Sequence, residues 1–340
     1  MLSYQIISKP EDWEQIKEPW NELLSKSITH VPFLRYEFLR QWWGTCGGGE
    51  WEKGELCIIT AHNEENLVGI APFFYKRNSN EKPSLMLIGS FEITDYLDFI
   101  VLPEFLDQFL LGLFSFLTTS DVQEWRDIDL YNILDYSPSL PALEKAAGLV
   151  GWKTKSEILQ KAPYISLPGN WETYLAGIDK KQRHEIRRKM RRLAESGHAY
   201  RWYVAEDPLT IDAEIEAFLD LMAQDEEKKE FLKPLMREQM QETMRCAFDT
   251  QCLHLSFLEI DGKKAAGYFS FNYLNRLWIY NSGLNRDFSV FSPGWVLLGY
   301  LLNQANEEKF EEFDFLRGDE NYKYKFGAID RAVIRVTLTR

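Results

Sequence analysis

The sequence predicts an α/β (α+β) protein of two domains, each with a mixed, mostly antiparallel twisted sheet flanked by helices. The chain has 340 residues, which is more than one hydrophobic core usually supports. Each half contains a pair of apolar runs joined by a polar turn, the pattern of a β-hairpin. In both halves helices precede the hairpin, and another strand, a long apolar helix and closing strands follow it. This shared order suggests a duplicated fold, although almost no identical residues align between the halves.

In the first half, polar turn residues at 62–66 join the two runs of the expected hairpin. The glycine run at 47–49 lacks the lysine and the following helix of a phosphate-binding loop, so it predicts a surface loop. The expected strands are 4–8, 55–61, 67–75, 85–88, 96–101 and 127–131, and the expected helices are 10–25, 35–43 and 105–117.

Two clusters of Pro and Gly at 161–170 mark the expected domain boundary, which gives domains at 1–166 and 167–340. In the second half, Asp261-Gly262 supplies the turn of the second hairpin. The expected strands are 200–205, 253–260, 265–272, 276–282, 313–316 and 333–339. The expected helices are one starting at Trp171, 179–196, two between 211 and 248, and 295–306.

Composition restricts the classes of function. Lys and Arg number 39 against 52 Asp and Glu, a net charge of −13 that disfavours general adhesion to DNA or to an anionic membrane. The four cysteines show no CxxC pairing, so we expect neither a disulfide framework nor a metal site. No leader pattern opens the sequence, and the most apolar stretch, 105–117, is too short to cross a bilayer, so a cytoplasmic location is expected.

The segment 314–327 contains the densest group of reactive side chains. It follows an expected strand end, where crevices form in α/β sheets, and it places two carboxylates beside Arg, Lys and Tyr. The candidate catalytic residues are Asp319, Glu320, Tyr322 and Tyr324, and Arg317 and Lys323 are candidate contacts to substrate or phosphate. The alternative interpretation is a solvated turn with local ion pairs.

Two other segments are candidate phosphate sites. A helix begins at Ser292-Pro293-Gly294-Trp295, shortly after the strand that contains Tyr280, and amides at a helix start attract phosphate. The same pattern also fits ordinary helix initiation. The helix at 179–196 carries nine basic or potentially basic residues, among them Arg183 and Arg187, and fits either a solvated face or a site for a phosphate-bearing ligand such as CoA or tRNA.

These segments together resemble a known family. The matching residues are Tyr280-Asn281-Ser282-Gly283, Phe291-Ser292-Pro293-Gly294, Phe313 to Glu320 with Tyr322-Lys323, and the basic run Lys181 to Lys189. They are similar to GNAT-domain proteins described as CelD-like or BcsL-like and linked with cellulose biosynthesis. The resemblance covers residues 171–327 and is weaker before them, where Asp95-Tyr96-Leu97-Asp98 is the nearest feature.

The resemblance implies two tandem GNAT-like domains in a FemAB-like arrangement, with a degenerate N-terminal domain that is structural or positions the acceptor. It implies an acyltransferase that moves an acetyl or other non-aminoacyl group from acyl-CoA, without a metal, to an amine or hydroxyl of a small-molecule, saccharide or peptide acceptor. A carboxylate, Asp319 or Glu320, would accept the acceptor's proton, and Tyr322 or Tyr324 would protonate the leaving group.

The Arg/Gln-x-x-Gly-x-Gly pyrophosphate loop typical of GNAT proteins is absent from this sequence. This departure keeps two alternatives open. One is a FemAB-like aminoacyltransferase that uses aminoacyl-tRNA as its donor, and the other is a non-catalytic binding or scaffold protein of the same fold.

Overall fold

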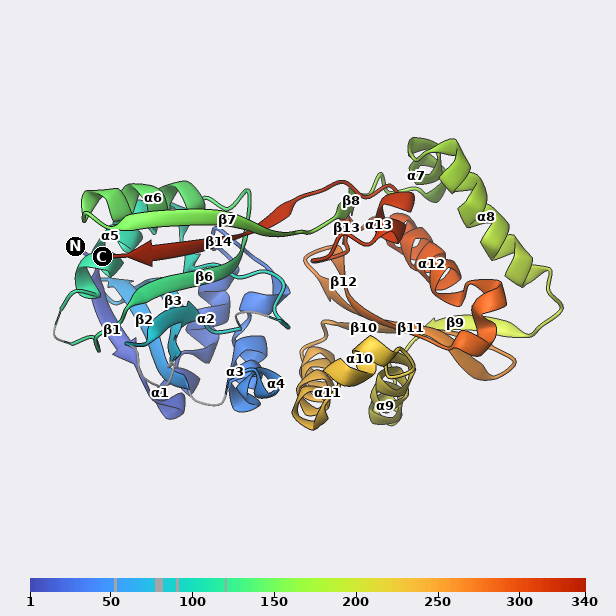
Figure 1. Cartoon of the computed structure of the whole chain (residues 1–340), viewed down its shortest axis with the longest axis horizontal. Coiled ribbons are helices and arrows are strands. Elements are labelled where there is room, and N and C mark those ends of the chain that lie inside the picture. The colour runs from blue at the N-terminus through green and yellow to red at the C-terminus, as the bar shows by residue number, and fades with distance from the viewer. Residues whose placement is uncertain (52–53, 77–81, 90–91, 120) are drawn as a thin grey trace. The chain divides into compact units, whose positions relative to one another are not determined.

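The computed structural model describes residues 1–51, 54–76, 82–89, 92–119 and 121–340 (Figure 1). Contacts divide the chain into two compact units: unit 1 is Met1–Gln160 with Ala332–Arg340, and unit 2 is Lys161–Arg331. Each unit is a mixed sheet with helices on both of its faces, which confirms the expected fold class. The division differs from the expected 1–166 and 167–340 mainly at the C-terminus, because the last strand belongs to unit 1.

The sheet of unit 1 begins with antiparallel pairs and contains one parallel pair. Its order is β1 (Ser3–Ile7), β2 (Gly54–Asn63), β3 (Asn66–Lys76), β4 (Ser84–Leu87), β6 (Asp127–Leu134), β14 (Ala332–Thr339) and β7 (Lys153–Lys161), and β5 (Ile100–Val101) also pairs with β3. The expected hairpin is β2–β3. Strand β4 runs parallel to β6, and β14 runs antiparallel to β6.

Helices α5 (Leu106–Phe116) and α6 (Ser139–Leu149) lie on one side of this sheet, and α1 (Pro10–Glu14), α2 (Lys17–Leu24), α3 (Tyr36–Gly44) and α4 (Cys46–Gly49) lie on the other (Figure 1). The single helix expected at 10–25 is therefore two helices. Trp13 and Trp20, one on each, are buried with their rings 5.8 Å apart. Within α4, Gly47 and Gly48 have positive φ, so the glycine run forms a tight turn.

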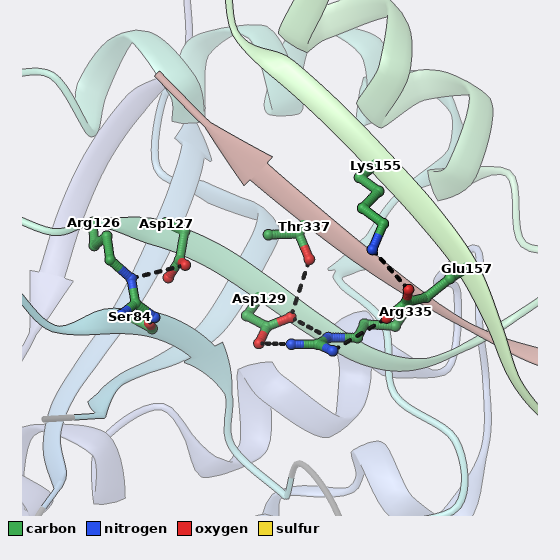
Figure 2. A network of polar contacts seen from close by, with 8 residues as sticks. All are labelled: Ser84, Arg126, Asp127, Asp129, Lys155, Glu157, Arg335 and Thr337. Carbon is green, nitrogen blue, oxygen red and sulfur yellow. Dashed lines mark hydrogen bonds and ion pairs between the residues drawn. The ribbon is translucent and has the colours of Figure 1, made fainter. Parts of the chain in front are cut away.

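The C-terminal strand is fixed to unit 1 by the polar network of Figure 2. Arg335 of β14 donates two hydrogen bonds to Asp129 of β6, each 2.8 Å long, and one of 3.1 Å to Glu157 of β7. Thr337 of β14 also donates to Asp129. Because a bidentate arginine–carboxylate pair fixes both distance and orientation, this network sets the position of β14 between its neighbours.

We expect Arg335→Met to lower the free energy of unfolding by about 1–3 kcal/mol, since Asp129 would lose both of its charged donors while remaining largely buried. The matched control is Lys155→Met, because Lys155 is 75% exposed and makes only a surface pair with Glu157, so we expect little change in stability. Urea unfolding of both variants measures the difference. Equal values would mean that the network does not hold β14 in place.

The sheet of unit 2 repeats the pattern of antiparallel strands followed by one parallel pair. Its order is β8 (Tyr164–Ser166), β13 (Glu312–Asp314), β12 (Arg276–Leu284), β11 (Lys263–Tyr273), β10 (Leu253–Ile260) and β9 (Tyr200–Val204). Strand β12 runs parallel to β13, and the second expected hairpin is β10–β11.

In Figure 1 the helices of unit 2 also form two layers. One face carries α7 (Trp171–Gly177), α8 (Lys180–Ala194), α12 (Pro293–Glu307) and α13 (Asn321–Lys325), and the other carries α9 (Ile211–Met222), α10 (Glu226–Phe231) and α11 (Pro234–Asp249). The region expected to hold two helices between 211 and 248 therefore holds three. A 3-10 helix, η3 (Arg286–Phe291), leads into α12.

The parallel pairing is short in both units, between β4 and β6 in unit 1 and between β12 and β13 in unit 2. The segments that follow it differ. In unit 1 the segment 94–98 lies beside β6: the Leu97 N–H donates to Asn132 O at 2.9 Å, and Asn132 Nδ2 donates to Thr94 O at 2.6 Å. This is why the strand expected at 96–101 is reduced to β5. In unit 2 the last pair joins Trp278 to Asp314, and β12 continues past it to Leu284.

Candidate active site in unit 2

The polar segment that follows β13 begins with a turn built by Asp314. Its side chain is fully buried, Oδ1 accepts the N–H of Leu316 at 2.7 Å, and Oδ2 pairs with Arg331 at 3.3 Å. Leu316 has a φ of 57°, a left-handed conformation that this hydrogen bond helps to hold. Asp314 therefore shapes the segment and is not available to a ligand.

Lys323 has a structural role that differs from the expected contact to substrate or phosphate. Its side chain is 3% exposed, and Nζ donates to the carbonyl oxygens of Phe315, Arg317 and Gly318 at 2.9–3.0 Å. Nζ also pairs with Glu320 at 2.9 Å. Because three backbone carbonyls surround the ammonium, Lys323 closes the turn. Arg317 lies half-buried on the same turn.

Tyr324 and Asp319 interact with a group of charged residues around Lys161. The Tyr324 hydroxyl donates to Asp330 at 2.6 Å, and Asp330 pairs with Lys161 at 2.7 Å. Desolvation, together with this carboxylate, raises the pKa of Tyr324 to about 12. Asp319 is exposed, and its charge acts on Lys161 and Tyr324. The structure therefore gives the hydroxyl of Tyr324 a partner of its own, away from the expected acid role.

The charge of Glu320 acts on both Tyr322 and Lys228. Burial raises the pKa of Tyr322 well above 10, and the nearby Tyr268 and Glu320 raise it further. The Glu320 side chain is 58% exposed. It lies against Gly318, where a Cβ would approach Glu320 Oε2 to 2.6 Å at a φ of +106°. Glycine at 318 thus leaves the room that the carboxylate occupies.

A lysine that was not among the residues expected from the sequence is bonded to β12. Lys228 of α10 is half-buried, and its Nζ donates to Asn281 Oδ1 at 2.9 Å and to Ser282 O at 2.6 Å. Asn281 Oδ1 also accepts the N–H of Ser282 at 2.8 Å. The main-chain N–H and C=O of Ser282 are therefore both bonded to side chains, those of Asn281 and Lys228.

Burial lowers the pKa of Lys228, and the carboxylates of Asp225 and Glu320 oppose that effect. The site therefore combines Lys228, Ser282, Glu320 and Tyr322. The sequence signal for Lys228 is indirect. A Cβ on Gly283 would lie 2.7 Å from the Met222 backbone nitrogen, so glycine lets α9 approach β12 closely and bring α10 over Ser282.

We expect Lys228→Met to lower the free energy of unfolding by about 1–3 kcal/mol, because Ser282 O and Asn281 Oδ1 would lose their charged donor. The control is Lys229→Met, an exposed neighbour on the same helix, for which we expect a change within about 0.5 kcal/mol. Chemical denaturation of both variants measures the effect. A stable Lys228→Met protein would show that these hydrogen bonds contribute nothing.

The start of α12 differs from the expected phosphate cradle. Ser292 has a φ of 53°, and its N–H already donates to Ser289 O at 3.0 Å. Pro293 has no N–H, so Gly294 and Trp295 supply the first-turn donors. Gly294 is buried, and its missing Cβ makes room for Leu284, whose Cδ2 would lie 2.6 Å away, rather than for a ligand.

The aromatic residues expected near the donor are used in packing. The Trp295 ring lies 4.7 Å from that of Phe326 and 4.2 Å from Lys189 Nζ, so it joins α12 to α13 and α8. The Tyr280 ring packs against Phe269 at 5.1 Å and Phe271 at 5.6 Å.

Arg183 and Arg187 also serve the fold rather than the expected ligand. Arg183 Nη1 donates to the carbonyl oxygens of Leu175 at 3.1 Å and Ala176 at 3.3 Å, which are free at the end of α7. Arg187 pairs with Glu172 at the start of the same helix. Both arginines therefore fix α7 to α8.

No group of three or more His, Cys, Asp or Glu side chains among the described residues is arranged to hold a metal ion. No helix in the described part of the chain is long and apolar enough to cross a membrane.

Residues 180–324, which include the whole of this site, match the family model described as an acetyltransferase (GNAT) domain. No curated protein gives a significant sequence match. The fold is similar to that of FemX, with a TM-score of 0.68 and 10% identity over 98% of this chain and 96% of that chain. It is also similar to L-PGS from Bacillus licheniformis, with a TM-score of 0.56 and 12% identity over 98% and 92% of the two chains.

A third similar structure is the C-terminal domain (DUF2156) of a putative lysylphosphatidylglycerol synthetase from Agrobacterium fabrum, with a TM-score of 0.58 and 11% identity over 95% and 92% of the two chains. At these identities the likeness concerns the fold alone. The fold and the matched domain together define a GNAT-type acyltransferase fold. The resemblance to CelD-like or BcsL-like proteins in particular stays an expectation.

Proposed function

We propose that unit 2 is an acyltransferase that moves an acetyl or other acyl group from acyl-CoA to an amine or hydroxyl of a small-molecule, saccharide or peptide acceptor. We place this activity in the cytoplasm, in polysaccharide or cell-envelope metabolism. The observation that supports it best is that the charge of Glu320 acts on both Tyr322 and Lys228, while Lys228 is bonded to Ser282 of β12. A carboxylate, a phenol and an ammonium thus act on one another.

In the proposed reaction the acceptor nitrogen or oxygen attacks the thioester carbonyl carbon, and Glu320 takes the proton that the acceptor loses. The new C–N or C–O bond forms, the carbonyl oxygen becomes negative, and the C–S bond then breaks. Tyr322 gives its proton to the departing thiolate. Burial and the neighbouring Tyr268 and Glu320 raise its pKa, so Tyr322 carries its proton when the reaction begins. The ammonium of Lys228 contributes positive potential at the oxygen that becomes negative.

A second donor is favoured by one observation. The start of α12 supplies only two amides to an anionic group, because Pro293 lacks an N–H and that of Ser292 is already bonded. A pyrophosphate-bearing donor would gain little there. Aminoacyl-tRNA would depend less on this turn, so it is the second candidate donor.

We propose a structural or acceptor-positioning role for unit 1. In that unit the segment 94–98 lies beside β6, which forms the parallel pair with β4. The part of a donor that approached the parallel pair of β4 and β6 would have to displace that segment first.

Isothermal titration with acetyl-CoA, CoA and a charged tRNA mixture tests the donor. We expect acetyl-CoA to bind with a Kd in the micromolar range. Binding of tRNA without binding of CoA would transfer the protein to the aminoacyltransferases. No binding of either would contradict the acyltransferase assignment and favour a scaffold.

A further inference from the structure

The basic residues of α8 divide into two groups. The first group is engaged within unit 2: Arg183 with α7 carbonyls, Arg187 with Glu172, Arg188 with Glu185, and Lys189 with Glu185 and Trp295. The second group includes Arg191 and Arg192, which are exposed and whose side chains form no ion pair or hydrogen bond within the described part of the chain.

Five of the exposed basic or potentially basic residues of α8 share one face of the helix. At 100° per residue, positions 181, 184, 188, 191 and 192 fall within a stripe about a third of the circumference wide. The residues of this stripe are Lys181, His184, Arg188, Arg191 and Arg192. With a rise of 1.5 Å per residue the stripe is about 16 Å long. We call it the α8 stripe.

A pocket of about 480 Å³ lies at the C-terminal end of the α8 stripe. Its lining residues are Arg188, Arg191, Arg192, Glu195, Ser196 and Phe291. The pocket is thus lined by three arginines and one glutamate, in a protein whose net charge is −13, and of the three arginines only Arg188 pairs with a carboxylate of the described residues, that of Glu185. Phe291 is the last residue of η3 and lies two residues before Pro293, the first residue of α12, so the pocket adjoins the start of α12.

Phe291, the aromatic residue that lines this pocket, is itself contacted by His198. The His198 ring meets that of Phe291 edge-on at 5.1 Å, and His198 Nδ1 lies 2.6 Å from Asp261 Oδ2. Cations in the last turn of a helix are explained by its dipole, which accounts for Arg191 and Arg192 alone. The dipole does not explain why Phe291, which belongs to η3 and contacts His198, lines the same pocket.

We propose that this pocket is a nucleotide site, in which the base lies against Phe291 and the phosphates bind Arg188, Arg191 and Arg192. Arginines beside an aromatic surface are the pattern that holds nucleotides through phosphate contacts and stacking. The inference rests on the proposed function in one respect. It takes the nucleotide to be the part of the acyl donor that does not react, and so names the ligand of the same enzyme. That nucleotide is either the 3′-phosphoadenosine diphosphate of CoA or a nucleotide of RNA, whose backbone would continue along the α8 stripe.

The experiment measures binding of adenosine 3′,5′-bisphosphate, CoA, inorganic pyrophosphate and a short single-stranded RNA by titration at fixed salt. The test variant is Arg191→Gln with Arg192→Gln. The matched control is Lys229→Gln with Lys233→Gln, two exposed lysines of unit 2 that remove the same charge at another place. A third variant, Phe291→Leu, removes the ring but keeps an apolar side chain. Thermal melting checks that every variant is folded.

We expect the arginine variant to lose at least about tenfold in affinity for adenosine 3′,5′-bisphosphate, and the lysine variant less than about twofold to threefold. Phe291→Leu should weaken adenosine 3′,5′-bisphosphate and leave pyrophosphate unchanged. Similar losses in the arginine and lysine variants would overturn the proposal, because only total charge would matter. The absence of bisphosphate, CoA and RNA binding to the unmodified protein would overturn it as well.

The titrations with CoA and with RNA identify the molecule to which the nucleotide belongs. A loss for CoA in the arginine variant assigns the pocket to acyl-CoA, and a loss for RNA assigns it to an RNA carrier. Both results support a nucleotide site. If the pocket binds its nucleotide but no acyl group is transferred, the proposed function fails and the site stands. If acyl transfer from CoA persists with an unchanged KM in the arginine variant, the function stands and the site fails.

Discussion

Glu320→Gln is expected to lower kcat for acyl transfer by about 10²–10⁴-fold, the usual contribution of a general base. The side chain keeps its size and can still accept a hydrogen bond from Lys323, which now lies 2.9 Å from the carboxylate. Because the carboxylate is 58% exposed, we expect the melting temperature to change little. Release of CoA thiol in the presence of an acceptor measures the rate.

The matched control for Glu320→Gln is Asp319→Asn, which removes the same charge one residue earlier. Asp319 is exposed and acts on Lys161 and Tyr324. We therefore expect Asp319→Asn to keep most of the activity. Equal loss in both variants would indicate a general effect of charge near the site, and full activity in Glu320→Gln would remove Glu320 from the mechanism.

The hairpins were predictable because their signals are local. Asp261-Gly262 supplies the left-handed residues of the second turn, and apolar runs flank it. The position of β14 was not predictable in this way. The strand was expected from its own residues, but its partners, Asp129 and Glu157, lie more than 170 residues earlier in the chain. Pairing over such separations leaves no local pattern.

The candidate site was predicted in part. The expected loop contains Glu320 and Tyr322, but sequence reasoning could not distinguish them from Lys323 and Tyr324, whose polar atoms are used inside unit 2. A charged side chain looks the same in a sequence whether it meets a ligand or a backbone carbonyl. Lys228 was missed because its partners, Asn281 and Ser282, lie 53 and 54 residues later.

The segment that fills the gap in unit 1 depends on one buried carboxylate. Asp98 has no exposed surface and accepts hydrogen bonds from the hydroxyls of Thr29, Ser137 and Ser139, each 2.5 Å long. Its Oδ1 also accepts the N–H of Phe99 at 2.8 Å. Burial raises the pKa of Asp98, and these four donors counteract that rise. The carboxylate therefore ties two distant parts of unit 1, Thr29 and the turn at 137–139, to the segment 94–98.

Asp98→Ala is expected to lower the free energy of unfolding by about 3–5 kcal/mol, because three buried hydroxyls and one amide would lose their common acceptor and a cavity would form. The control, Asp107→Ala, removes a carboxylate that is 61% exposed and pairs with Lys145, so we expect at most about 1 kcal/mol. Urea unfolding followed by tryptophan fluorescence measures both. If Asp98→Ala were as stable as the control, the segment would be held by its apolar neighbours, and filling of the gap would not depend on this carboxylate.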